Sequence, residues 1–420
     1  MTERGRSFLR PLLSFDMRTK FLSLIILGLL ILAGTVFRIG QASASNRSVT
    51  APRDPYACER TLRALNRYRD LAAKDDGALL PATEEPVEPG DSYADAPRLI
   101  RLLSLIGDLP ADAVPADSES YEGELVEAVK RFQSRHGIKP DGCINTTTLE
   151  QLNIPLGVRV RQLELALERW RRRPYDPARP AIVLNVPEFR LRAFGGASAA
   201  GNDPELEMKV VVGQAPDHKS PILRSQLEAV IFRPYWNVPA RIQRDELWPE
   251  IIKDRSWVSA NNFELVTPQG EVAGDGPVSE HMLSKIGKGE LQLRQKPGPK
   301  NTLGLMKFVF PNEYGVYMHD TSARWLFAEE RRDLSHGCIR VENPQDLAEW
   351  ILREQPGWSR ERIDEAIHGT ESISVRIKRP IQIVIMYSTA VVTQDGEVRF
   401  FQDIYGEDQA LEKELAAQRK

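Results

Sequence analysis

The spacing of the apolar residues changes near Ala181, and this change most limits the folds open to the chain. Before it, apolar residues recur every three or four positions, which is typical of amphipathic helices. After it, short alternating or apolar runs such as 182–186 and 189–194 are punctuated by glycine and proline, which is typical of strands. The pattern predicts a multidomain α+β protein with a helical part followed by a β-rich part, and 420 residues suffice for two or three domains.

The same periodicities predict individual elements. Helices are expected over residues 56–74, 98–106, 124–136, 146–152, 158–173, 244–254, 343–353 and, as a frayed polar tail, 407–420. Strands are expected over 182–186, 189–194, 207–212, 229–232, 305–310, 316–319, 380–392 and 397–401, the last two as a hairpin around Asp395-Gly396. Asn343 is the expected N-cap of its helix, with Pro344 at the first position.

The chain begins with a basic and then an apolar segment. Five cations between Arg4 and Lys20 precede an apolar run over residues 21–37, and about 17 residues is the lower limit for crossing a bilayer. The cationic flank predicts an inner-membrane anchor with its N-terminus in the cytoplasm. Ala42-Ser43-Ala44 leaves a cleaved export signal open. Either interpretation places the residues beyond about 45 in the periplasm.

The composition of the chain bears on its expected partners and on its cysteine chemistry. A formal net charge of −3 gives no basic excess, so nucleic acid is not expected as a partner. The chain has three cysteines, and export to an oxidising compartment leaves a disulfide between Cys58 and Cys143 open.

The third cysteine ends the run Ser335-His336-Gly337-Cys338, nineteen positions after His319. A thiolate and an imidazole are the minimum set for nucleophilic acyl transfer. A lone cysteine is often only a small buried residue, and Cys/His clusters can bind zinc. Spacing alone leaves catalysis and a structural cysteine open, with zinc least favoured because its ligands are usually closely paired.

The residues around both motifs resemble the L,D-transpeptidase catalytic domain, whose members remodel peptidoglycan. The resemblance is carried by 317–321 and 335–344, and by the upstream blocks 233–239 and 296–304, which are similar to the large periplasmic branch that forms 3-3 cross-links. It covers roughly residues 56–406. The pattern over 128–149 resembles a small three-helix peptidoglycan-binding module, for which a helical linker domain is the simpler alternative.

This resemblance implies a division of the chain into six segments. They are a basic segment with an anchor or signal (1–45), a scaffold helix with an acidic linker (46–97), a peptidoglycan-binding-like helical domain (98–155), a connecting helix (156–180), a β-rich catalytic domain (181–406) with a cap insertion over about 241–300, and a tail (407–420).

The resemblance also implies roles for single residues. Cys338 is the expected nucleophile and His319 its base, oriented by the backbone carbonyl of Asp320, with the N–H groups of Gly337 and Cys338 as oxyanion donors. His336 is a less favoured base. Expected substrate-binding residues are Tyr317, Arg340, Ser335, His336, Trp236, Asn237 and Arg324. For Arg340, an internal ion pair with Glu342 or another acid is an equal alternative to a substrate carboxylate.

The expected reaction has two steps. The thiolate attacks the carbonyl between the third, diamino residue of a tetrapeptide stem and its terminal D-alanine, which leaves. An amine of a second stem then takes the acyl group from Cys338 and gives a 3-3 cross-link. Stem peptides and glycan strands are the expected partners, carbapenem-type β-lactams the expected inhibitors, and no metal or organic cofactor is expected.

Three alternatives to this reaction remain open. Water as the acceptor would make a carboxypeptidase, and a lipoprotein lysine would make an anchoring enzyme. A non-catalytic wall-binding scaffold is the alternative from another class.

Overall fold

The computed structural model describes residues 55–418, except 111, 114, 116, 173–175 and 197–202. The predicted anchor over 21–37 lies outside the described residues. Within the described residues, no helix combines the length and hydrophobicity needed to cross a bilayer.

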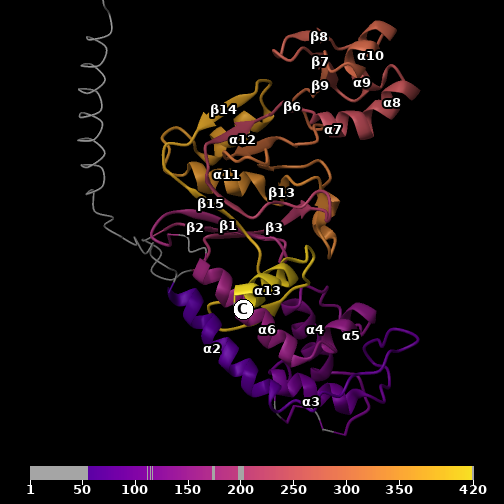
Figure 1. The fold of residues 1–420 in the computed structure, drawn as a ribbon, viewed down its shortest axis with the longest axis vertical. Helices are drawn as coiled ribbons and strands as arrows, with labels where there is room; N and C mark the ends of the chain where they lie inside the picture. The colour runs from indigo at the N-terminus through magenta and orange to yellow at the C-terminus, as the bar shows by residue number, and fades with distance from the viewer. Residues whose placement is uncertain are drawn as a thin grey trace, which may run out of the picture. The chain divides into compact units, whose positions relative to one another are not determined.

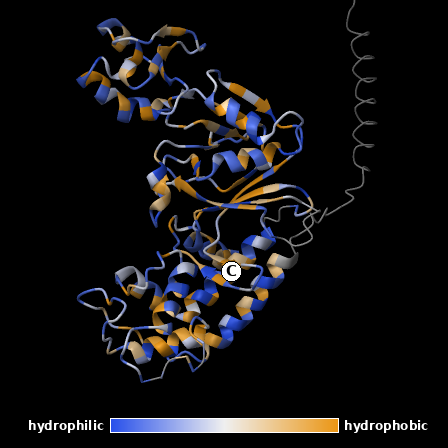
Figure 2. Cartoon of the chain, turned by 180° about the vertical axis from the view of Figure 1, so that it is seen from behind, coloured by the Kyte–Doolittle hydropathy of each residue, from blue (hydrophilic) through white to orange (hydrophobic). Residues whose placement is uncertain are grey.

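Five helices, close to the predicted ranges, form the N-terminal part of the described chain. They are α2 (Pro55–Ala72), α3 (Ala96–Ile106), α4 (Glu124–Arg135), α5 (Thr146–Leu152) and α6 (Leu156–Arg172). Their apolar faces enclose one core, in which Leu99, Leu103, Leu125, Val129 and Leu163 are fully buried. Hydrophilic and hydrophobic residues therefore alternate around these helices, as Figure 2 shows.

The turn between α4 and α5 is organised by one buried glutamine. The Gln133 side-chain amide donates to the Cys143 carbonyl at 2.8 Å, and its oxygen accepts from the Gly142 N–H at 2.9 Å. Asn145, which stands where the peptidoglycan-binding module usually has glycine, caps α5 by accepting from the Thr148 N–H at 2.9 Å. The departure from the family pattern therefore has a local structural reason.

The C-terminal half is built on one large mixed sheet with the strand order β14-β5-β10-β11-β13-β3-β2-β1-β15-β4, and β12 pairs with β3 (Figure 1). The strands are β1 (Ala181–Asn185), β2 (Arg190–Phe194), β3 (Leu206–Gly213), β4 (Leu223–Gln226), β5 (Ala229–Phe232), β10 (Met306–Val309), β11 (Met318–His319), β12 (Asp333–Ser335), β13 (Ile339–Val341), β14 (Ile373–Arg376) and β15 (Gln382–Met386). The helical part followed by this β-rich part confirms the predicted fold class.

Two helices, α11 (Pro344–Leu352) and α12 (Arg360–His368), supply buried residues to the core on one face of this sheet. Helix α11 starts as predicted, with Pro344 at its first position, although the Asn343 side chain makes no capping bond. On the central strands, Phe308, Met318 and Ile339 point into this core. Their neighbours in sequence point to the opposite face, because side chains alternate along a strand.

A smaller subdomain with its own core lies between β5 and β10 in sequence. Its elements are β6 (Trp236–Asn237), α7 (Ala240–Ile242), the π-helix η1 (Gln243–Leu247), α8 (Trp248–Lys253), α9 (Trp257–Ala260), β7 (Phe263–Val266), β8 (Val272–Gly274), α10 (Glu280–Gly287) and β9 (Gln292–Gln295). Four of these strands form a separate sheet in the order β6-β9-β7-β8. We call this subdomain the cap. Tyr317 of the main domain packs against the cap core.

The predicted strand over 380–392 is wrong as a single element. It is interrupted at Tyr387–Thr389, where the Asn185 side chain accepts from the Ser388 N–H at 2.8 Å. The first half, β15, joins the large sheet. The second half, β16 (Ala390–Val392), pairs with β17 (Val398–Phe400) in a two-stranded sheet that contributes residues to the helical core.

The C-terminal helix α13 (Glu407–Gln418) is docked rather than frayed along its first turns. Asp408 forms an ion pair with Arg169 of α6 at 2.5 Å, and Leu411 is buried. An ion pair and an apolar anchor at one end explain why this segment is ordered.

Replacement of Phe400 by alanine is expected to lower the free energy of unfolding by about 3–5 kcal/mol. The ring is fully buried, lies edge-on to Tyr68 with 5.2 Å between centroids, and carries the Arg159 guanidinium 4.9 Å from its centroid. The cavity would therefore open between the hairpin and the helices. Urea denaturation measures the change, and a loss below about 1 kcal/mol would contradict this packing.

Candidate active site

Three polar side chains form a row across the central strands of the large sheet. Lys307 of β10 lies opposite His319 of β11, and His319 lies opposite Arg340 of β13. Residues opposite each other in neighbouring strands share a face, so all three side chains lie on the face away from the α11 and α12 core. Tyr317 and Cys338 directly precede β11 and β13, two positions before His319 and Arg340, and interact with each other.

The half-buried thiol of Cys338 lies among polar groups. Burial raises its pKa, whereas hydrogen-bonding interactions with the backbone and side chain of Tyr317, and the charges of Lys307 and Arg340, oppose this effect. Burial is the largest of these causes, so the pKa of the thiol is raised overall. The thiol therefore needs a proton acceptor or a change in its surroundings to become a thiolate near neutral pH.

His319 is almost fully buried and its imidazole is held by the backbone. Nδ1 is hydrogen-bonded to the backbone carbonyl of Asp320. Burial, with the nearby charge of Arg340, lowers the pKa of His319 to about 3. The imidazole is therefore neutral at physiological pH, and Nδ1 must carry the proton because it faces a carbonyl. In this tautomer Nε2 carries the lone pair, and the Leu303 backbone also interacts with the ring.

His319 lies in β11, and Cys338 directly precedes β13, the strand paired with β11. In the described part of the chain, no hydrogen bond joins the Cys338 thiol to the His319 imidazole. Tyr317, which precedes His319 by two positions, contacts both residues. The centroid of its ring is 5.7 Å from that of the imidazole, and its side chain interacts with Cys338. Catalytic hydrogen bonds are often long before substrate binds. The role of His319 as the base therefore stays a prediction.

The carbonyl that holds His319 is fixed by the side chain of its own residue. The Asp320 carboxylate is buried and accepts from the Leu305 N–H at 2.8 Å, and burial raises its pKa. Gly304 makes this possible, because a Cβ at that position would lie 2.3 Å from Asp320 Oδ2. Gly304 also has a φ of +62°, which favours glycine.

Replacement of Gly304 by alanine is expected to lower both stability and activity. The left-handed backbone alone costs about 1–3 kcal/mol, and the methyl group would push the Asp320 carboxylate away and shift the carbonyl that orients His319. Gly77→Ala is the matched control, since Gly77 has a φ of +68° and open space around its Cβ position. Melting temperature and turnover should fall further for Gly304→Ala, and equal effects would contradict the contact.

The loop before Cys338 is held by hydrogen bonds of the Ser335 hydroxyl. The Ser335 hydroxyl accepts from the Gly337 N–H at 3.1 Å and donates to the Cys338 carbonyl at 2.6 Å. The Gly337 N–H is thus bonded within the loop, and Ser335 is buried. The oxyanion role of Gly337 and the substrate contact of Ser335 stay predictions. The Cys338 N–H has no partner within the described residues and is the amide left for that role.

His336 points toward the cap. Its Nε2 lies 2.8 Å from Oε1 of Glu246 in η1, and its ring is edge-on to that of His218, 4.7 Å between centroids. It therefore links the loop to the cap, and no contact with Cys338 supports a base role.

The three peripheral residues differ in their positions. Trp236 is buried in the cap core and forms a hydrogen-bonding interaction with Tyr317, whose side chain in turn reaches Cys338. Asn237 is exposed on the other side of β6, so the structure does not bring it to the cluster. Arg324 donates to the Glu342 carbonyl and lies 3.5 Å from Asp320 Oδ1, which makes it a brace behind the site.

Arg340 and Lys307 are the unpaired cations of the site. No ion pair joins Arg340 to Glu342 in the described chain; Glu342 instead accepts from the Lys209 N–H at 2.9 Å. The Arg340 Nε is buried without a hydrogen-bond partner. Lys307 was not predicted as a site residue, although it lies in the strand predicted over 305–310. Its place beside His319 depends on strand pairing.

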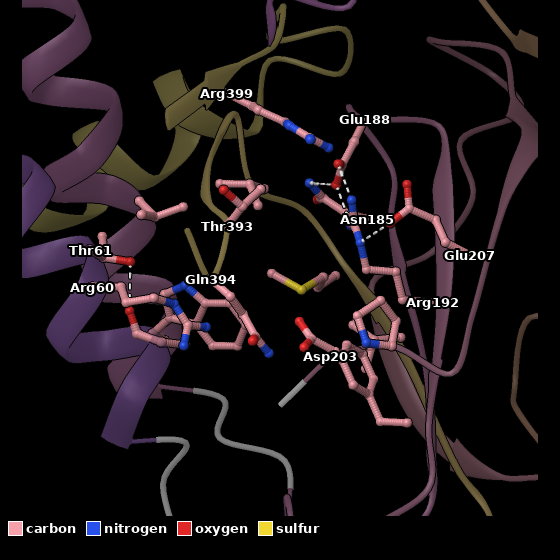
Figure 3. Close-up of a pocket in the computed structure, with 18 of the residues that line it drawn as sticks. Arg60, Thr61, Asn185, Glu188, Arg192, Asp203, Glu207, Thr393, Gln394 and Arg399 are labelled. Carbon is pink, nitrogen blue, oxygen red and sulfur yellow. Dashed lines mark hydrogen bonds and ion pairs between the residues drawn. The ribbon is translucent and has the colours of Figure 1, made fainter. Parts of the chain in front are cut away.

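A large cavity lies elsewhere, between α2, the large sheet and the β16–β17 hairpin. It measures about 700 Å³ and contains none of the residues around Cys338 (Figure 3). Its buried carboxylate, Glu188, is neutralised by Arg192 at 2.5 and 2.8 Å. Volume alone therefore does not identify the chemical site. In the part of the chain that the structure describes, no group of three or more His, Cys, Asp or Glu residues could hold a metal ion.

Sequence comparisons agree with this geometry. Residues 179–381 match the family model described as "L,D-transpeptidase catalytic domain", and residues 99–152 match "Putative peptidoglycan binding domain". A Haemophilus influenzae protein named "Putative L,D-transpeptidase" is 30% identical over 248 residues. The match covers 59% of this chain and 48% of that protein, so this chain spans about half the length of the relative.

Solved structures give weaker matches. L,D-transpeptidases from Stackebrandtia nassauensis and Xylanimonas cellulosilytica each align at 13% identity over 73% of this chain, covering 97% and 100% of theirs, with TM-scores of 0.26 and 0.23.

Proposed function

We propose that this chain, whose residues 179–381 form an L,D-transpeptidase catalytic domain, is a cysteine acyltransferase that forms 3-3 cross-links in peptidoglycan. The observation that supports the proposal is a neutral, backbone-held His319 in β11, which pairs with β13, the strand that starts directly after Cys338. The peptidoglycan-binding domain over 99–152 supports a polymeric cell-wall substrate.

In the first step, the Cys338 sulfur attacks the carbonyl carbon between the diamino residue and the terminal D-alanine. The thiol proton passes to Nε2 of His319 and then to the departing D-alanine nitrogen, and a thioester is left on Cys338. An amine of a second stem then attacks the thioester and regenerates the thiol.

The developing oxyanion needs donors on the same side of the thiol. The Cys338 N–H is the donor left by the loop, and the Tyr317 hydroxyl, held by Trp236, is the side chain nearest to the thiol. One such donor is typically worth about 3 kcal/mol of transition-state stabilisation. We assign the pocket wall to Tyr317 and Trp236 and give Asn237 and Arg324 no contact with substrate.

The location of the reaction follows from its substrate. A cell-wall polymer lies outside the cytoplasm, and the apolar run over 21–37 would hold the enzyme at the inner membrane or direct its export. Carbapenem-type β-lactams would acylate Cys338 as donor mimics.

The test uses the purified chain with tetrapeptide muropeptides, analysed by mass spectrometry. Dimers that lack one D-alanine support the cross-linking reaction. Shortened monomers alone would mean a carboxypeptidase, and attachment of a lipoprotein lysine peptide would mean an anchoring enzyme. Unchanged muropeptides with folded protein would leave only a wall-binding scaffold and reject the enzyme.

A further inference from the structure

Two half-buried cations flank His319, and neither has an acidic partner among the described residues. Lys307 and Arg340 occupy the strand positions on either side of His319. The thiolate of Cys338 is the negative group that acts on each of them, and burial lowers the pKa of both. Half-buried charges are normally paired, so two cations without a carboxylate on one sheet face require a reason.

The surroundings hold these cations in place without neutralising them. The Lys307 ammonium lies 3.7 Å from the centroid of the Tyr317 ring, in a cation–π contact that leaves its net charge unchanged. The Arg340 Nε is buried and has no hydrogen-bond partner. Arginine recognises carboxylates in a planar, often bidentate geometry, and lysine adds a point charge.

We propose that Lys307 and Arg340 together form a binding site for a single carboxylate group of the donor peptide, directly beside the Cys338 thiol. The inference deepens the proposed function and rests on it for the identity of the donor. Lys307 is a specificity-determining residue in this site, and it would not be replaced by Arg340 alone, because the two approach the anion from opposite sides of His319.

The carboxylate that fits is that of the terminal D-alanine. It is three covalent bonds from the carbonyl carbon that the thiol attacks, so it stays within roughly 4–5 Å of the reacting carbon. Both cations interact electrostatically with the Cys338 thiolate, so they lie on the side of the site where the bound carbonyl would sit. A donor that ends in this carboxylate would thus be selected, and its scissile bond would be positioned over the thiol.

A different role would be to stabilise the thiolate without binding substrate. The two roles are separated by alkylating Cys338 with iodoacetate and with iodoacetamide, which share a leaving group and differ in charge. Loss of thiolate lowers both rates equally, whereas loss of an anion site lowers only the rate with iodoacetate. Peptide mapping by mass spectrometry restricts the measurement to Cys338.

The ratio of the iodoacetate rate to the iodoacetamide rate should be about tenfold higher in the wild type than in Lys307→Met or in Arg340→Gln. A tenfold change is the size expected for one charge a few ångströms away at the protein surface. Lys307→Arg, which keeps the charge, should retain most of the ratio. Circular dichroism and melting curves establish that each variant is folded. An unchanged ratio in folded Lys307→Met overturns the proposal.

A second arm uses tetrapeptide donors that end in a free carboxylate or in D-alaninamide. The wild type should prefer the carboxylate by about tenfold in kcat/KM, mainly through KM, and Lys307→Met should lose that preference. If the alkylation ratio shifts but no donor reacts, the proposed function fails and the anion site stands. If donors react but neither preference depends on Lys307, the anion site fails and the function stands.

Discussion

Cys338→Ala is expected to abolish D-alanine release and dimer formation, with turnover at least about a thousandfold below the wild type. The physical reason is that no other thiol lies in the cluster. Ser335 is the nearest hydroxyl in sequence, but it is committed to the Gly337 N–H and the Cys338 carbonyl. The measurement is release of D-alanine from tetrapeptide muropeptides over time.

Two controls separate chemistry from folding. Cys143→Ala removes a thiol outside the site, in the turn before α5, and should keep its activity. Cys338→Ser should be nearly as inactive as Cys338→Ala, because a hydroxyl ionises far less readily than a thiol. Activity retained in Cys338→Ala would assign the chemistry to another residue.

His319→Gln is expected to lower turnover by about 10²–10⁴-fold, the usual contribution of a general base. Glutamine can still donate a hydrogen bond to the Asp320 carbonyl, so the backbone around β11 should stay in place. The thiol would then have no group to take its proton. His336→Gln is the comparison, and its smaller effect would agree with its contact to Glu246 rather than to Cys338.

The same residue gives a pH dependence with a defined sign. Burial and Arg340 lower the pKa of His319 from 6.5 to about 3 in the folded chain. Between these values the unfolded chain binds the extra proton, so the contribution of His319 to stability is present above about pH 6.5 and is lost as the pH falls toward about 3. Wild-type stability should therefore fall more than that of His319→Gln between about pH 7 and pH 4.5 in urea denaturation. Parallel losses would mean that His319 is protonated in the folded protein.

The chemistry of the site could be read from the sequence because its two reactive side chains stand in short local motifs. Cys338 and His319 each lie at the edge of a strand, and the carbonyl that holds His319 belongs to the next residue. The helices of the N-terminal part could also be predicted from the sequence, since each has an apolar face at helical spacing.

What could not be read depends on contacts between distant segments. Lys307 reaches the site only through the pairing of β10 with β11, and a sequence does not give strand register. The Gly337 N–H donates to the Ser335 hydroxyl, two positions earlier, because the loop turns back on itself there. Trp236 and Asn237 were both expected in the pocket, but alternation along β6 sends their side chains to opposite sides.

The pairing of the cysteines and the packing of the β16–β17 hairpin also depend on contacts between distant segments. All three cysteines are described, and Cys143 is in no disulfide, so the open pairing with Cys58 is not formed in the structure. The hairpin of β16 and β17 lies in the segment that was assigned to the catalytic part. It buries Phe400 among the N-terminal helices, where its ring stacks on that of His136, more than 260 positions earlier in the chain. Such long-range packing leaves no local signal.

The covalent intermediate tests the central claim most directly. Intact-protein mass spectrometry of the chain after brief incubation with a tetrapeptide muropeptide should find an adduct equal to the donor minus D-alanine, mapped to Cys338 and absent from Cys338→Ala. The adduct should disappear when a second stem is added, as the dimer forms. Dimer formation by the wild type without any adduct on Cys338, or by Cys338→Ala, would contradict cysteine acyl transfer.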